Sequence, residues 1–364
     1  MKSAVLYPFK REDISYLLSQ EKIYHDYTIS DVVAPRGSGL CGKDISHADC
    51  RDKLGMLVKE NLDECLKNVD ALLITSGGDK LYNADIEEVI EKALTYKKDI
   101  ICNVRLGHSL QKEIRQSCRQ SGKTFIYGLE EKIRWQETFA KEWHQMKTPV
   151  VFVTSILADA NNMELMIKVK QELCRQGYKV TVVGAKPELQ MYGGIYSGVM
   201  DALARGNLVE NSVPTTIKFL NHFFKCVEIQ ETPDLIMVDV PGGLIETPRF
   251  PNESGVFAYL LTRAVQADYA IGTALYGTYT QDALEQISEE INKRFGFQLD
   301  CVHISNKMLH LSSSLQKGKM EFLYLPYDEI YVGGRSQGGM LINNFLKQDK
   351  IRTIAEDIIR VLGE

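Results

Sequence analysis

Short apolar runs alternate with amphipathic segments along the first 127 residues of the chain. Continuous apolar runs are typical of buried parallel strands, and apolar residues three or four positions apart are typical of helices. The expected strands are Ser3–Pro8, Tyr27–Pro35, Ala71–Ser76, Asp99–Val104 and Thr124–Tyr127, and the expected helices are Asp13–Gln20, Leu62–Val69, Asp85–Lys97 and Leu110–Ser121. This alternation predicts an α/β domain with a mainly parallel, Rossmann-like sheet.

A second series of the same kind begins after Pro149. The segment Glu130–Gln145 has the pattern of one more helix, and the proline that follows it interrupts the chain. The later strands are expected at Val150–Ser155, Lys179–Gly184, Asp234–Pro241, Asp268–Tyr276 and Asp300–Ser305, with helices at Met163–Gln176, Thr215–Gln230, Gly255–Gln266, Gln281–Phe295 and Ile351–Leu362. We therefore expect two α/β domains with mainly parallel sheets, at residues 1–147 and 148–364.

Composition supports an ordinary globular protein. Hydrophobic residues make up 44% of the 364 residues and charged residues 25%, which fits neither a disordered nor a fibrous chain. The net charge of -5 argues against nucleic acid as a partner, because phosphate contacts need a basic face. No apolar stretch approaches the ~18 residues that span a bilayer, so we expect no membrane segment and no signal peptide.

The eight cysteines are scattered, and several lie inside apolar patterns, as reduced buried thiols do. We expect a cytoplasmic protein. Cys41, His47 and Cys50 lack a fourth ligand at a useful spacing, so no metal is expected. Cys102 is followed by Arg105 and His108, which would favour a thiolate, but a buried strand cysteine explains the pattern as well.

Ligands of open α/β sheets bind beyond the carboxyl ends of strands, so the loops after strands hold the candidate sites. The loop that follows Val150–Ser155 occupies the place of a phosphate-binding loop, but it contains neither glycine nor lysine. Its candidate residues are Ser155, Asp159, Asn161 and Asn162. Helix-start amides bind anions, Asp159 would repel them, and a simple helix cap is the alternative.

Asp239 ends another apolar strand and is followed closely by Gly242 and Gly243. P-loop enzymes place a carboxylate that organises a metal, or a glycine that senses phosphate, at such a position. A tight glycine turn with a solvated aspartate is the alternative.

Two glycine-rich segments follow strands in the first domain. The G-x-G-x-x-G string at 37–42 comes after the second strand and opens no clear helix, so an anion or peptide contact and a flexible turn are better supported than a dinucleotide. The candidate residues of the two segments are Arg36, Gly39, Gly42, Lys43, Gly77, Gly78 and Asp79. We expect the loops of both domains to line one cleft.

Several short motifs resemble the clostridial peptide maturation system proteins, which are encoded beside radical SAM maturases and short Cys-rich precursors. They are Leu-Tyr-Pro-Phe at 6–9, Ala-Pro-Arg-Gly-Ser-Gly-Leu-Cys-Gly-Lys-Asp-Ile-Ser at 34–46, Gln-Gly-Tyr-Lys-Val at 176–180, Thr-Pro-Asp-Leu-Ile at 232–236, Pro-Gly-Gly at 241–243 and Arg-Phe-Gly-Phe-Gln-Leu-Asp-Cys at 294–301. The resemblance implies a role in natural-product biosynthesis, maturing a ribosomally made peptide (a RiPP), with the precursor peptide and its radical SAM maturase as partners.

The second domain also resembles P-loop proteins of the dethiobiotin-synthetase and nitrogenase-iron-protein kind. Ser155 and Leu157 stand where that family has glycines, and Asn162 stands where it has lysine. The resemblance therefore implies a degenerate P-loop fold, and efficient hydrolysis of a nucleoside triphosphate is not expected.

Three classes of function compete. The resemblance favours an accessory protein that binds the precursor peptide or its maturase, with segments Gln190–Gly198 and Tyr324–Gly339 as docking surfaces. A nucleotide-dependent ligase, transferase or switch in the same pathway is the alternative, so a nucleotide stays open as a cofactor. An enzyme that uses Cys102 lacks a convincing base. A homodimer is compatible with the sequence.

Overall fold

The computed structural model describes residues 1–11, 23–24, 26–76, 83–134, 142–247, 255–277, 279–330, 333–335, 339–347 and 350–363. The chain forms two compact units, one of residues 1–130 with 186–196 and the other of residues 131–185 with 197–364. This division differs from the expected boundary at 147, because the connecting segment belongs with the second unit and a short later segment belongs with the first.

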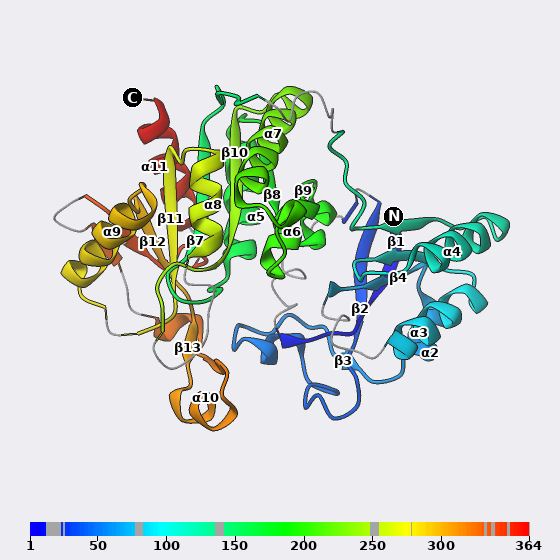
Figure 1. Cartoon of the computed structure of the whole chain (residues 1–364). Helices are drawn as coiled ribbons and strands as arrows, with labels where there is room; N and C mark the ends of the chain where they lie inside the picture. The colour runs from blue at the N-terminus through cyan, green and yellow to red at the C-terminus, as the bar shows by residue number, and fades with distance from the viewer. Residues whose placement is uncertain are drawn as a thin grey trace. The chain divides into compact units, whose positions relative to one another are not determined.

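The first unit is built on a parallel sheet in the order β3-β2-β1-β4-β5-β6. Its strands are β1 (Lys2–Tyr7), β2 (Tyr27–Val33), β3 (Val58–Lys59), β4 (Ala71–Ile74), β5 (Asp99–Cys102) and β6 (Phe125–Tyr127). Helices α2 (Leu62–Asn68), α3 (Asn83–Thr95) and α4 (His108–Gln120) connect the later strands, as Figure 1 shows. This is the Rossmann strand order, so the expected fold is confirmed, with β3 as a strand that the pattern did not predict.

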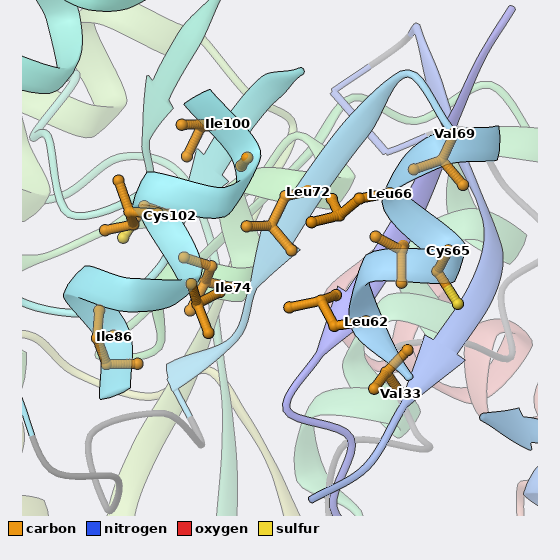
Figure 2. Packing of buried hydrophobic residues seen from close by; sticks show 14 of the residues in the cluster. Val33, Leu62, Cys65, Leu66, Val69, Leu72, Ile74, Ile86, Ile100 and Cys102 are labelled. Atoms are coloured by element: carbon orange, nitrogen blue, oxygen red, sulfur yellow. The ribbon is translucent and has the colours of Figure 1, made fainter. Parts of the chain in front are cut away.

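One face of this sheet packs against the three helices (Figure 2). Val5, Leu72 and Ile74 alternate with residues of the opposite face along their strands, because successive side chains of a strand point to opposite sides. Leu62 and Leu66 come from α2, one helical turn apart. The hydrophobic periodicity of the sequence thus predicts which strand and helix residues form this core.

The opposite face of the first sheet packs against residues from distant parts of the sequence. Leu6 and Leu73 lie in one buried cluster with Phe9, Tyr27 and Met191. Met191 belongs to a short 3-10 helix at Pro187–Tyr192, inside the segment 186–196. The expected long connection between the second-domain elements therefore contributes to the core of the first unit.

The second unit contains the parallel strands β16-β12-β11-β7-β10-β8, in that order, with β15 added antiparallel to β16. The strands are β7 (Val150–Ser155), β8 (Val180–Gly184), β10 (Leu235–Gly243), β11 (Tyr269–Ala274), β12 (Cys301–Ile304), β15 (Gly333–Arg335) and β16 (Leu341–Asn343). The helices are α5 (Asn162–Arg175), α6 (Gly198–Ala204), α7 (Val213–Glu231), α8 (Val256–Ala264), α9 (Gln281–Phe295) and α11 (Lys350–Gly363).

A small hairpin interrupts this pattern. Strands β13 (Lys307–Leu309) and β14 (Phe322–Tyr324) pair antiparallel on either side of helix α10 (Leu311–Lys317). Among the described residues, no helix has both the length and the apolar character that crossing a bilayer requires.

The helix expected at Glu130–Gln145 is not present in the described part of that segment. Residues 130–134 and 142–145 are not helical, and the middle lies outside the described residues. The main-chain amides of this segment donate instead to side chains of α7: Arg134 to Gln230 at 3.1 Å and His144 to Asn221 at 2.8 Å. At the described ends of the segment, these tertiary hydrogen bonds take the place of helical ones.

Candidate functional site

The loop between β7 and α5 lies at the carboxyl end of a central strand of the second sheet. At its base, the Oδ1 atom of Asn162 accepts hydrogen bonds from the hydroxyls of Ser155, at 3.1 Å, and Thr273. Thr273 ends β11, the strand next to β7. All three side chains are buried, so they form a neutral network beneath the start of α5.

Asp159 supplies a carboxylate to the first turn of α5. Its Oδ1 atom accepts a hydrogen bond from the main-chain amide of Asn162 at 3.2 Å. Free amides at a helix start are the groups that bind a phosphate. The loop therefore places its own anion where a phosphate would be held.

The other side of the loop is closed by β10. This strand continues through Gly243, with a bulge between Val240 and Gly243, so the tight glycine turn that was one alternative after Asp239 does not form. Gly242 adopts a φ of 79°, which suits glycine, and lies in the bulge. A Cβ atom on Gly243 would lie 2.1 Å from the carbonyl oxygen of Leu157, so the loop rests directly on this glycine.

Two polar residues that sequence reasoning missed complete this edge. The Ser305 hydroxyl, just beyond β12, donates to the side chain of Asn161. Lys307 of β13 donates from Nζ to the carbonyl oxygen of Asp159 at 2.9 Å. Ser305, Lys307 and Thr273 all stand at or just after the ends of parallel strands, so the carboxyl-end rule applied to every strand would have found them.

His303 lies deeper in the same sheet. Its Nδ1 atom accepts a hydrogen bond from the amide of Phe345 at 3.1 Å. Complete burial lowers the pKa of His303 to about 3, so the imidazole is neutral at physiological pH. Its Nε2 atom is buried without a hydrogen-bond partner among the described residues.

The candidate residues of the second unit thus come together, but as a closed arrangement. Ser155, Asn162 and Gly243 lie around one loop whose polar atoms bond to one another. Asp239 is buried within β10, two residues before the bulge. What this geometry does chemically is to hold the loop rigid and to place a negative charge at the start of α5.

The segment 36–43 of the first unit follows β2 as expected. Gly37, Gly39 and Gly42 all have φ values between 73° and 81°, and a Cβ at any of them would meet no atom within 4 Å. These glycines therefore serve the backbone conformation of a turn rather than the close approach of another group. The Arg36 guanidinium pairs with Glu60, and Lys43 is exposed.

Asp44 directly follows this segment and anchors it. Its carboxylate accepts hydrogen bonds from the amides of Ser46 at 3.0 Å, Leu54 at 3.1 Å and Gly55 at 2.8 Å. Burial alone would raise the pKa of Asp44, but these hydrogen bonds outweigh it and hold the pKa at about 2. The acidic residue beside the glycine string is thus a structural support.

The remaining candidates have different outcomes. Gly77, Gly78 and Asp79 lie outside the described residues. Cys102 is fully buried, and its thiol donates to the carbonyl oxygen of Val104 at 3.5 Å. The Cys41 thiol donates to the carbonyl oxygen of Ala34 at 3.5 Å. Within the described ranges, no three His, Cys, Asp or Glu side chains gather closely enough to hold a metal ion.

Comparison with known proteins gives likeness in structure only. No family model matches the chain, and no curated protein matches it. A crystal structure of a DUF1611 family protein from Anabaena variabilis matches with a TM-score of 0.59 and 8% identity, over 98% of this chain and all of that chain. This likeness shows a shared α/β fold that extends over both units.

Two further solved structures match more distantly. The MinD cell division protein of Aquifex aeolicus has a TM-score of 0.34 and 14% identity, over 60% of this chain and 98% of that chain. Chloroplast FtsY from Physcomitrella patens has a TM-score of 0.28 and 12% identity, over 63% of this chain and 76% of that chain.

Proposed function

We propose that this chain is a cytoplasmic accessory protein that binds a ribosomally made precursor peptide, or the radical SAM maturase that modifies it, without hydrolysing a nucleotide. The resemblance to peptide maturation system proteins supplies the partner class. The second unit supplies the argument for binding without hydrolysis, and it also offers a surface for the partner.

The observation that carries the proposal is the hydrogen bond that the main-chain amide of Asn162 donates to the carboxylate of Asp159. Phosphoryl transfer needs amides and a cation to neutralise the transferred group. Here the helix-start amide is engaged by an acid, and Lys307 donates to the main-chain oxygen of the same residue. A nucleotide-dependent ligase or switch would have to displace both contacts, so we place it second.

An exposed apolar surface on the hairpin supports the binding role. Leu311 and Leu315 lie one turn apart on α10 and are 44% and 52% exposed, and Leu323 on β14 is 42% exposed. Large exposed apolar side chains on a small element favour a contact with another protein. The Gln190–Gly198 segment fits this role poorly, because its residues are mostly buried.

A pull-down followed by titration tests the proposal. The purified chain is mixed with the precursor peptide and the radical SAM maturase that are encoded beside its gene, with and without ATP or GTP. We expect binding that does not depend on nucleotide. Binding that requires nucleotide, clear nucleotide hydrolysis, or no binding while the peptide is still modified would each contradict the proposal.

A double variant tests the surface. Leu311→Glu with Leu315→Glu should weaken partner binding by at least tenfold, since two apolar anchors become charged. Ile229→Glu is the matched control, because Ile229 is 56% exposed on α7 in the same unit. Equal loss in the control would show that the effect is not specific to the hairpin.

A further inference from the structure

Three buried oxygen atoms lie at the carboxyl edge of the first sheet, all within the first unit. They are Oε2 of Glu188, Oδ1 of Asn103 and the hydroxyl of Tyr24. In the part of the chain that the structure describes, none of these atoms has a hydrogen-bond partner. A buried polar atom without a partner is costly, and such atoms mark strain or a site for a group from outside the chain.

Glu188 is the charged member of this group. Its side chain is fully buried, and its other oxygen accepts a hydrogen bond from the amide of Ser76, just beyond β4, at 2.7 Å. Burial raises the pKa of Glu188, and the amide and side chain of Ser76, the main-chain amide of Glu188 and the charge of Lys186 offset only part of that effect. A carboxylate in this position gains most from a cationic partner.

Asn103 and Tyr24 lie around Gly128, the residue that follows β6. A Cβ atom on Gly128 would lie 2.0 Å from Oδ1 of Asn103 and 3.3 Å from the hydroxyl of Tyr24. Oδ1 of Asn103 therefore occupies the place that a side chain at position 128 would take, and the hydroxyl of Tyr24 lies beside it. The Asn103 amide nitrogen donates to the sulfur of Met191 at 3.4 Å, which fixes Oδ1 as the atom turned toward Gly128.

The segment 186–196 connects these groups. Glu188 stands two residues before Gln190, whose amide donates to the carbonyl oxygens of Gly128 at 2.8 Å and Glu130 at 2.9 Å. The charge of Glu188 also helps to raise the pKa of the Tyr24 phenol, after burial, which has the largest effect. The carboxylate, the phenol and the amide oxygen thus belong to one neighbourhood.

We propose that Glu188, Asn103 and Tyr24 form a binding site for a primary ammonium group. An ammonium group has three N–H donors and no acceptor, which matches three acceptor oxygens, and its charge complements the carboxylate. The inference rests on the proposed function in one respect, because the ammonium is taken to belong to a peptide, as its N-terminus or as a lysine side chain.

Calorimetric titration of the full chain with small amines tests the site without any peptide partner. Glycinamide offers an α-ammonium, and Nα-acetyl-lysinamide offers only a side-chain ammonium, so the pair distinguishes the two sources. Binding of at least one is expected. Tetramethylammonium, which has no N–H donor, should not bind at the site, and potassium chloride should not replace the amine.

Variants locate the binding. Glu188→Gln keeps the oxygen that accepts from Ser76 and removes the charge, and it should weaken amine binding by about tenfold or more. Gly128→Ala should abolish binding, because its Cβ would displace the acceptor oxygen Oδ1 of Asn103. Tyr24→Phe removes one acceptor and should cost about threefold to tenfold, which keeps the test valid if another variant fails to fold.

The matched controls are Glu91→Gln, an exposed glutamate on α3, and Gly107→Ala, where a Cβ would meet no atom within 4 Å. Both should bind the amine as the parent does. Failure of both amines to bind, unchanged binding in Glu188→Gln, or equal competition by potassium would overturn the ammonium site. The peptide pull-down is independent of these titrations, so a failed site and a failed proposed function can be told apart.

Discussion

The two parallel sheets carry their polar groups differently at their carboxyl ends. In the second unit, Asp159, Asn162 and Thr273 bond to one another and to the main chain around the loop after β7. In the first unit, Glu188 and Asn103 are equally buried, but each keeps an oxygen atom that has no partner among the described residues. The loop after β7, which we call the closed edge, is satisfied internally, whereas the carboxyl end of the first sheet, which we call the open edge, keeps acceptor oxygens without a partner. Elsewhere in the second unit, Nε2 of His303 and Nδ2 of Asn344 also lack a partner among the described residues.

This difference teaches that sheet topology alone does not locate a binding site. Both edges meet the rule that places ligands at the carboxyl ends of parallel strands. The rule identifies where a site can be, whereas unused hydrogen-bonding capacity identifies where a ligand would gain most. By that criterion the carboxyl end of the first sheet is a better candidate than the loop after β7, although the sequence favoured that loop.

The largest effect is expected where the closed edge is most tightly packed. Gly243→Ala places a Cβ 2.1 Å from the main-chain oxygen of Leu157, and a backbone atom cannot move aside cheaply. We expect a loss of about 3 kcal/mol in the free energy of unfolding, measured by urea denaturation. Gly363→Ala, where no atom lies within 4 Å, is the control. Equal stability of the two variants would show that the loop does not rest on Gly243.

The next largest effect concerns the open edge, where Glu188 should make the stability of the fold depend on pH. The raised pKa of Glu188 means that the folded chain holds this proton more tightly than the unfolded chain. Its contribution to stability is therefore complete below the ordinary glutamate pKa and is lost as the pH rises through the raised value.

Glu188→Gln has no proton to lose, so it should not lose stability as the pH rises through the raised pKa of Glu188. Relative to the parent, we expect the variant to gain stability as the pH rises from 4 to 7.5, measured by denaturant midpoints across the range. Glu91→Gln should leave the pH profile unchanged. A parent chain whose stability rises over this range through Glu188 would contradict the assignment.

Removing the carboxylate of Asp159 should give the loop after β7 an unpartnered group of its own, a main-chain N–H donor. Asp159→Ala frees the amide of Asn162, costs about 1 kcal/mol as the loss of a helix-start contact, and should create a response to phosphate. The measurement is the melting temperature with and without inorganic phosphate. Asp282→Ala, in the first turn of α9, is the control and should show no new response. No phosphate response in Asp159→Ala would mean that the carboxylate does not occupy an anion position.

The smallest effect concerns the hydroxyl of Thr273. Thr273→Val keeps the shape of the side chain and removes the donor to Asn162, so we expect a loss of about 0.5–1 kcal/mol. Thr262→Val on α8 removes a hydroxyl that bonds only to its own helix and should cost less. Denaturant titration of both variants decides whether the network beneath α5 contributes to stability.

Local patterns predicted most of the fold because they report burial directly. The runs Ala71–Ser76 and Val150–Ser155 are apolar throughout most of their length, and each forms a buried central strand. The two described ends of Glu130–Gln145 are not helical, because Asn221 and Gln230 of α7 supply the partners that their amides would otherwise find within a helix. Short-range periodicity contains no information about such partners.

The candidate sites also include features that the sequence shows and features that only the structure shows. The absence of glycine and lysine in the loop after β7 was plain from the sequence, and so was the position of Asp159 before the helix. The position of Glu188 was not, because it lies in a connection between second-domain elements and packs into the first unit. Its approach to Ser76 spans 112 residues of sequence.

The sequence by itself therefore determined the two α/β series, the strand ends where sites can lie, and the absence of glycine and lysine from the loop after β7. Only the tertiary structure decided which polar atoms found partners, since hydrogen bonds between distant segments depend on how those segments pack. It brought Asn103 and Tyr24 together beside Gly128 and placed Glu188, from the distant segment 186–196, in the same unit. No local pattern connects these residues, because packing, rather than sequence spacing, leaves a buried polar atom unsatisfied.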